Sequence, residues 1–274
     1  MIIDVGRCVG CYNCFLACRD EHVGNDHRPY AVPQPESGHR WIDIQVQEFG
    51  GGPRVRVTHT PLPCLQCQNA HCIEAGQGAI TRRADGIVLI DPEKAAGRRD
   101  LVAACPYGVI YWNEAANTAQ KCTFCAHLLD RGWSQPRCAE VCPTQAILFG
   151  DLDDPASDIA RQAAAGALEE LRPQLNSGAR VRYRHLPAPF LSGEVVLADQ
   201  PDLPAPGVRI ELDDGSRRFE TRSDNYGEFR FPAIKPRQRY RVRIEHPGYA
   251  SLEISVAPHA PKDLGALMLQ RGGP

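Results

Sequence analysis

The sequence lacks the features that would place it among secreted, membrane-spanning or nucleic-acid-binding proteins. It has no apolar run of about 18 residues, the least that a membrane-spanning helix needs. Its 31 basic and 33 acidic residues give a net charge of −2, without the basic excess typical of nucleic-acid binding. The chain opens MIIDVGRC, without a Sec or twin-arginine signal, so we expect a cytoplasmic protein without a disulfide framework.

Cysteine is absent after Cys142, and all twelve cysteines lie in tight groups before that point. The first group is Cys8-x2-Cys11-x2-Cys14-x3-Cys18. This spacing lets a loop turn around a [4Fe–4S] cubane, and the fourth cysteine ligates the other cluster of a two-cluster ferredoxin. Zinc favours paired CxxC knuckles rather than four cysteines in one short segment.

The complementary group is Cys122-x2-Cys125-x12-Cys138-x3-Cys142, followed by Pro143, the usual end of a ferredoxin ligand run. The fourth cysteine of each group is expected to ligate the cluster that the other group holds, and this exchange predicts the ligands of two clusters. Cluster A would be held by Cys8, Cys11, Cys14 and Cys142, and cluster B by Cys18, Cys122, Cys125 and Cys138.

The middle group provides one cluster and lacks the ligands for another. Cluster C would be held by Cys64, Cys67, Cys72 and Cys105. A fourth cluster would need cysteines where the chain has Gly76, Ala95, Arg98 and Leu101. The twelve cysteines therefore fill three sets of four, and we expect three [4Fe–4S] clusters.

No other motif indicates catalysis, because the chain has neither a Gly-rich phosphate loop nor a Ser/His/Asp set. We therefore predict no catalytic residue. Lys121 is interpreted as a solvated surface residue, with cluster tuning as the alternative. The histidines near the cysteines are interpreted as solvent or interface residues, and the tryptophans as ordinary packing: His22, His27, His39, His59, His71, His127, Trp41, Trp112 and Trp133.

Three zones follow one another along the chain. Residues 1–150 are the predicted ferredoxin-like domain, and residues 151–190 are a helical and extended connector. Within the connector, apolar spacing predicts a helix over 158–175, followed by an extended segment that ties back to the first zone. Residues 191–272 are a predicted antiparallel β domain.

Short segments of alternating apolar and polar residues, separated by turn residues, fill the last zone. The predicted strands lie at 193–199, 207–214, 217–224, 227–234, 239–246 and 251–258, with a turn at 224–227. The stretch 193–269 resembles the transthyretin-like or carboxypeptidase-regulatory β domain. The predicted fold class is α+β, a double bacterial-ferredoxin-like cluster domain followed by a small antiparallel β-sandwich.

The first 150 residues resemble the iron–sulfur subunit of molybdopterin oxidoreductases of the dimethyl-sulfoxide-reductase type. The lost site, the runs GIVLIDPEKA and ACPYGVIYWNEAANTAQKCTFCAHLLD, and the β domain are similar to the small subunits of pyrogallol–phloroglucinol transhydroxylase and resorcinol hydroxylase. The resemblance implies a large catalytic partner that holds a bis-pterin cofactor, expected to contain molybdenum, with tungsten as the alternative. It also implies that the lost site once connected cluster B to cluster C. Cluster C would then exchange electrons only slowly with A and B.

Alternative functions remain open at this point. The chain could be a stand-alone polyferredoxin, although its connector and β domain are unusual for a small carrier. It could also be the relay subunit of another molybdopterin reductase. A structural or adhesion protein with vestigial clusters is disfavoured, because none of the three ligand sets has lost a cysteine.

Overall fold

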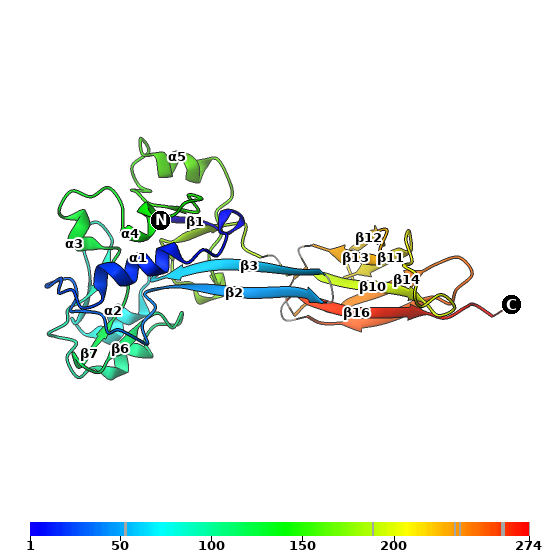
Figure 1. Cartoon of the computed structure of the whole chain (residues 1–274), viewed down its shortest axis with the longest axis horizontal. Helices are drawn as coiled ribbons and strands as arrows, with labels where there is room; N and C mark the ends of the chain where they lie inside the picture. Colours follow the sequence, from blue (N-terminus) through cyan, green and yellow to red (C-terminus); the bar gives the residue numbers. More distant parts are fainter. Residues whose placement is uncertain (52–53, 188, 233, 236, 259–260, 274) are drawn as a thin grey trace. The chain divides into compact units, whose positions relative to one another are not determined.

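The computed structural model describes residues 1–51, 54–187, 189–232, 234–235, 237–258 and 261–273 (Figure 1). The chain divides into two compact units. The first comprises Met1–Val46 and Thr58–Leu186, and the second comprises Gln47–Val57 and Pro187–Pro274. Residues 151–186 of the predicted connector therefore belong to the same unit as the cysteines. Ala188 and Ala233, which the predicted connector and fourth strand include, lie outside the described residues.

The cysteine-rich unit is built from short elements joined by loops. Its helices are α1 (Asn13–His22), α2 (His71–Gly76), α3 (Ala126–Leu129), α4 (Arg137–Glu140) and α5 (Asp158–Ala164), with 3-10 turns η1 (Val5–Arg7), η2 (Arg99–Val102) and η3 (Pro173–Leu175). Its strands include β1 (Ile2–Asp4), β4 (Ile80–Arg82), β5 (Val88–Ile90), β6 (Tyr111–Asn113), β7 (Thr118–Gln120), β8 (Ile147–Leu148) and β9 (Arg182–Arg184). In the described ranges, no helix has the length and hydropathy needed to cross a membrane.

Three strands join the start of this unit to its end. β1 pairs antiparallel with β8 and parallel with β9. Tyr183 of β9 is fully buried, and its hydroxyl donates a hydrogen bond to the carbonyl of Pro61 over 2.9 Å. The segment after the connector helix therefore ties back to the cysteine-rich zone, as predicted. Two longer strands, β2 (Ile42–Gly51) and β3 (Arg54–Pro63), pair with each other, and each has residues in both units.

The predicted helix over 158–175 is wrong in its second half. α5 begins after Ser157, whose hydroxyl accepts a hydrogen bond from a backbone N–H of the first turn. Gly166 lies just beyond its end, where continuing the helix would cost backbone entropy. Glu169 then pairs with Tyr183 in an isolated β-bridge. Pairing with the chain at β9 therefore overrides the helical spacing of the later apolar residues.

The second unit is a two-layer β-sandwich. One sheet has the order β13–β10–β16 and the other the order β12–β11–β14–β15. These strands are β10 (Leu191–Leu197), β11 (Arg209–Asp213), β12 (Arg218–Arg222), β13 (Glu228–Phe231), β14 (Tyr240–Glu245), β15 (Leu252–Val256) and β16 (Lys262–Leu269). Inward side chains of both sheets, among them Val195, Ile210, Phe229 and Val242, form one apolar core.

The structure adds two features to the predicted β domain. Each predicted strand corresponds to an observed one, but β16 was not predicted. The four-stranded sheet and the β10–β13 pair are antiparallel, whereas β10 and β16 run parallel. The predicted fold class, a ferredoxin-like cluster domain followed by a small β-sandwich, is confirmed.

The turn between β12 and β13 gives a testable prediction of stability. Gly227 has a φ of +83°, and a Cβ at this position would lie 2.8 Å from the carbonyl oxygen of Val195. We expect Gly227→Ala to lower the melting temperature of the β unit by about 10 °C or more, because a left-handed φ and a backbone clash add. Thermal scanning of the full chain measures this effect.

Gly215 provides the matched control for Gly227. Its φ is +88°, but no atom lies within 4 Å of the corresponding Cβ position. Gly215→Ala should therefore show the conformational cost alone, about 4–8 °C. Equal shifts for the two variants would show that the close approach to Val195 does not constrain the turn.

Candidate iron–sulfur centres

The four cysteines predicted for cluster A lie together around the start of α1. Burial raises the pKa of the Cys14 thiol to about 12, and the neighbouring thiols of Cys8, Cys142 and Cys11 add to the shift. Backbone amides face the same sulfurs, and the N–H of Ala146 donates to Cys142 Sγ over 3.2 Å. Cys11 is exposed, so this group reaches the protein surface.

The four cysteines predicted for cluster B are all buried. Cys18 lies on the buried face of α1, while Cys138 lies in α4, which packs against α1. Burial raises the pKa of Cys138 well above its usual range, and the thiols of Cys122, Cys125 and Cys18 contribute. The left-handed backbone at Phe124 turns this loop so that its N–H donates to Cys122 Sγ over 3.4 Å.

The four cysteines predicted for cluster C line a single pocket. Burial raises the pKa of Cys72 to about 11, and the thiols of Cys64, Cys105 and Cys67 contribute to this shift. Burial raises the pKa of the Cys105 thiol. Hydrogen bonds from the backbone N–H groups of residues 107–109 lower it in part. This group is more accessible than group B, because three of its cysteines are half-buried.

The donor set fits iron–sulfur clusters. All twelve cysteines are free thiols in the structure, and the three groups use every one of them. Burial and mutual repulsion disfavour thiolates here unless a cation replaces the protons, and a coordinated thiol is deprotonated. Amides aimed at the sulfurs would then stabilise the thiolate ligands. Ligation by these residues stays a prediction.

The three groups follow one another in the order A, B, C. The Cys14 thiol of group A lies close enough to raise the pKa of Cys18 and Cys138 of group B. The backbone N–H of Cys64, in group C, donates to the Cys122 thiol of group B, and the two thiols also repel each other. The prediction that a lost site separates B from C is therefore wrong, because these two groups are neighbours.

A small apolar core occupies the region where a fourth cluster would have its ligands. Ala95 and Leu101 are fully buried in this core with Ile80. Cys72 and Cys105 pack against its edge, whereas a different cysteine of group C faces group B. The lost site therefore adjoins group C without interrupting the sequence of groups.

The other two positions of the lost site also have new roles. A Cβ on Gly76 would lie 2.9 Å from side-chain atoms of Ile80, so the apolar core leaves no room there. Arg98 donates to the carbonyl of Ala75 over 3.0 Å and forms an ion pair with Asp100. Packing and hydrogen bonds replace cluster ligation at this place in the fold.

Lys121 is not a surface residue, contrary to the prediction. Its relative exposure is 2%. The ammonium group donates to the carbonyl oxygens of Val88 and Cys122. Lys121 also lines the pocket of group C. It lies beside the predicted cluster ligands, and the sequence did not reveal its burial.

The prediction of solvent or interface histidines is wrong for His22, His39 and His127, which are buried. His22 continues the buried face of α1, and its Nε2 lies 3.7 Å from Cys125 Sγ. The spacing of four residues from Cys18 is the signal that could have placed His22 inside. His27 and His59 are half-buried and His71 is exposed.

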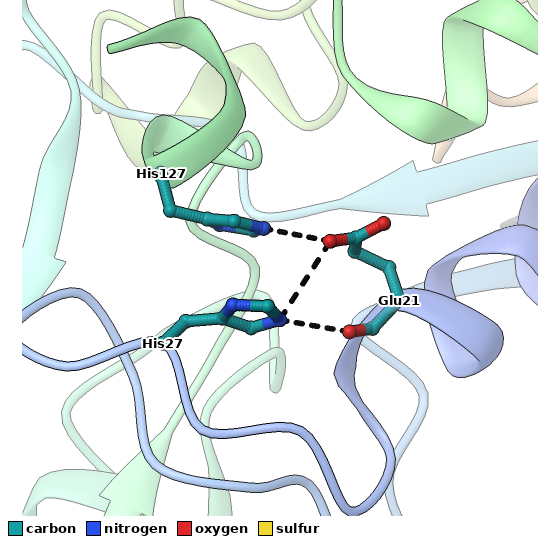
Figure 2. Close-up of side chains that lie close together, drawn as sticks. All are labelled: Glu21, His27 and His127. Carbon is teal, nitrogen blue, oxygen red and sulfur yellow. Dashed lines mark hydrogen bonds and ion pairs between the residues drawn. The ribbon is translucent and has the colours of Figure 1, made fainter. Parts of the chain in front are cut away.

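Figure 2 shows Glu21 of α1 beside the two stacked imidazoles of His27 and His127. The ring centroids of His27 and His127 are 3.8 Å apart and their planes differ by 20°. His127 Nε2 donates to the Glu21 carboxylate over 2.9 Å, and His27 Nε2 donates to the Glu21 carbonyl over 2.8 Å. A histidine nitrogen binds a metal ion in the plane of its ring, and one ion cannot lie in the planes of two stacked rings. We therefore describe these three residues as a hydrogen-bonded cluster beside group B.

The tryptophans occupy different environments. Trp41 is buried in the main core of the unit, and Trp112 packs against the small core beside group C. Trp133 is 42% exposed, with the guanidinium of Arg137 5.8 Å from its ring centroid. Ordinary packing describes the first two.

Known proteins match both halves of the chain. A family model for a 4Fe-4S dicluster domain matches residues 55–152, and one for a carboxypeptidase regulatory-like domain matches residues 191–268. The pyrogallol hydroxytransferase small subunit of Pelobacter acidigallici is 39% identical over 277 residues, covering 98% of each chain. A tetrathionate reductase subunit of Salmonella typhimurium is 34% identical over 70% of this chain and 74% of its own. The arsenate respiratory reductase iron–sulfur subunit of Shewanella sp. strain ANA-3 is 29% identical over 67% of this chain and 94% of its own.

The cysteine groups and the matching dicluster domain define an iron–sulfur protein, an electron-transfer subunit of an oxidoreductase complex rather than its catalytic subunit. The chain belongs to the family of the pyrogallol hydroxytransferase small subunit. The family resemblance that the sequence motifs indicated is thereby confirmed.

Proposed function

We propose that this chain holds three [4Fe–4S] clusters and serves a large molybdopterin catalytic subunit that acts on polyhydroxylated aromatics by hydroxyl transfer or hydroxylation. The observation that carries the cluster count is the gathering of twelve thiols in three groups of four. The substrate class rests on the similarity to a pyrogallol hydroxytransferase subunit along almost the whole of both chains.

The ligand sets follow the three groups. Cys8, Cys11, Cys14 and Cys142 would hold cluster A, Cys18, Cys122, Cys125 and Cys138 cluster B, and Cys64, Cys67, Cys72 and Cys105 cluster C. Such clusters supply one-electron storage and transfer. The chain contributes burial, amides directed at the sulfurs, and the order A, B, C. Group B lies in the middle and is buried, while the outer groups have more accessible cysteines.

Metal analysis tests the cluster count directly. We expect about twelve iron atoms and about twelve acid-labile sulfides per chain, from three cubanes of four irons each. Anaerobically purified protein should be analysed for iron, sulfide and zinc. About sixteen irons would indicate a fourth site with other ligands, and stoichiometric zinc would contradict the iron–sulfur assignment.

A stand-alone electron carrier is the second candidate. The second folded unit and the small net charge of −2 favour a fixed partner, because a free carrier usually has a strongly charged face that guides it to partners. Gel filtration of native anaerobic extract separates the two functions. A subunit elutes with a much larger protein that contains molybdenum, and a free carrier elutes alone. Fractionation of the same cells tests the predicted cytoplasmic location.

A further inference from the structure

Lys121 presents an electrostatic problem that its hydrogen bonds do not solve. Its ammonium group is buried, and both of its hydrogen bonds go to uncharged carbonyl oxygens. Among the described residues, no ion pair joins it to a carboxylate. A buried charge without a counter-charge is strongly destabilising, so buried ammonium groups are normally paired with an anion. The protein part of this site provides none.

The surroundings of Lys121 show where an anion would be. It lines the same pocket as all four cysteines of group C. It also directly precedes Cys122 of group B in the sequence. Its ammonium group donates to the carbonyl oxygen of Cys122 over 3.1 Å, so it lies at the Cys122 loop as well as in the pocket of group C. One ammonium group therefore lies next to predicted ligands of two neighbouring groups.

The neighbouring side chain of Gln66 fixes the position of this charge. Gln66 Nε2 donates to the carbonyl of Cys122 over 3.3 Å, and its Oε1 accepts from the N–H of Val88 over 2.7 Å. The same two residues provide the carbonyls that Lys121 binds. Gln66 is itself 1% exposed, so the whole arrangement is buried. The ammonium is thus held between β5 and the Cys122 loop.

We propose that Lys121 is a counter-ion shared by clusters B and C, which favours their reduced forms and leaves cluster A little affected. This inference rests on the ligand sets of the proposed function. A cubane held by four thiolates is an anion whose charge grows on reduction, and nearby charge is a main determinant of its potential. A fixed positive charge at the boundary between B and C therefore stabilises an added electron on either cluster.

The test is a redox titration of the intact complex, followed by electron paramagnetic resonance. Lys121→Met should lower the equilibrium constant for reduction of B and C at least about tenfold, a shift of about 59 mV for one electron. Signals are assigned with Cys11→Ser for A and Cys67→Ser for C. Lys121→Arg keeps the charge and should restore most of the shift. Lys94→Met removes an exposed lysine and should change none of the three potentials.

The outcomes separate this inference from the proposed function. Unchanged potentials of B and C in Lys121→Met protein with full iron content would overturn the counter-ion role and leave the three clusters intact. An equal shift of all three clusters would also overturn it. If Lys121→Met and Lys121→Gln lose the iron of B and C while Lys121→Arg retains it, charge is required and the inference stands. If Lys121→Arg also loses this iron, the shape of the lysine side chain rather than its charge is required, and the inference is overturned. Absence of iron from the native complex would overturn the proposed function itself.

Discussion

Replacing Cys138 by Ser is expected to remove most of the iron from the protein and most of its soluble yield. Cys138 is 7% exposed and lies in the main core with Cys14, Cys18 and Cys64, so all three groups meet in that core. A serine there loses a cluster ligand and leaves a buried hydroxyl, which costs about 1–3 kcal/mol even before the lost metal is considered. Metal binding is folding energy in units with so little regular structure.

Cys11→Ser is the matched comparison, because it also removes one ligand. Cys11 is exposed and lies at the outer edge of group A. We expect this variant to fold and to retain about eight irons, those of clusters B and C. Iron and sulfide content, soluble yield and circular dichroism of both variants are measured side by side. If Cys138→Ser retains as much iron and yield as Cys11→Ser, group B is not the centre on which the unit depends.

The sequence predicted the features that depend on local geometry. Spacings of two and three residues between cysteines determine how a loop can turn, and the structure places thiols such as Cys8, Cys11 and Cys14 together. Alternation of apolar residues likewise predicted strands such as β11 and β14, since one face of each is buried. Both signals are patterns over a short stretch of sequence, so they can be recognised without knowledge of the tertiary contacts.

Features that depend on distant contacts were predicted poorly. The adjacency of groups B and C rests on the N–H of Cys64 and the thiol of Cys122, which no spacing rule connects. The burial of Lys121 depends on carbonyls of β5 and of the Cys122 loop meeting around it. The helix over 158–175 failed for the same reason, because Glu169 pairs with a strand residue instead.

The lost fourth site shows both kinds of inference at one place. The absence of cysteine at Gly76 and Leu101 was plain in the sequence. The apolar core that occupies this place could not be predicted from the sequence. The core around Ile80 is assembled from two hairpins, α2 and η2, which are separate segments of the chain. Its position beside group C, rather than between B and C, changes the functional prediction. Group C is the last member of a continuous series, and electrons that passed a cluster held there would have to leave the chain at that end.

That position makes Cys67→Ser the most informative variant for function. Cys67 is half-buried at the accessible end of the series, and burial raises the pKa of its thiol to about 11. A hydroxyl transfer between two aromatics needs no net electron export. We therefore expect the complete complex with Cys67→Ser to keep its turnover of a polyhydroxylated aromatic within about twofold. Cys11→Ser, which disrupts the other end, should lose at least about tenfold.

A relay subunit of a reductase would behave differently. Its electrons must enter through the whole series, so both variants should lose turnover with a reducing dye as donor, by at least about tenfold. Iron content of about eight per chain in each variant controls for assembly, since each removes a ligand of one cluster. Equal loss in the two variants would therefore contradict hydroxyl transfer and favour a reductase or a hydroxylase, because hydroxylation also releases electrons that must leave the complex. Retained turnover in Cys67→Ser alone, with cluster C absent, would show that the catalytic subunit does not need cluster C.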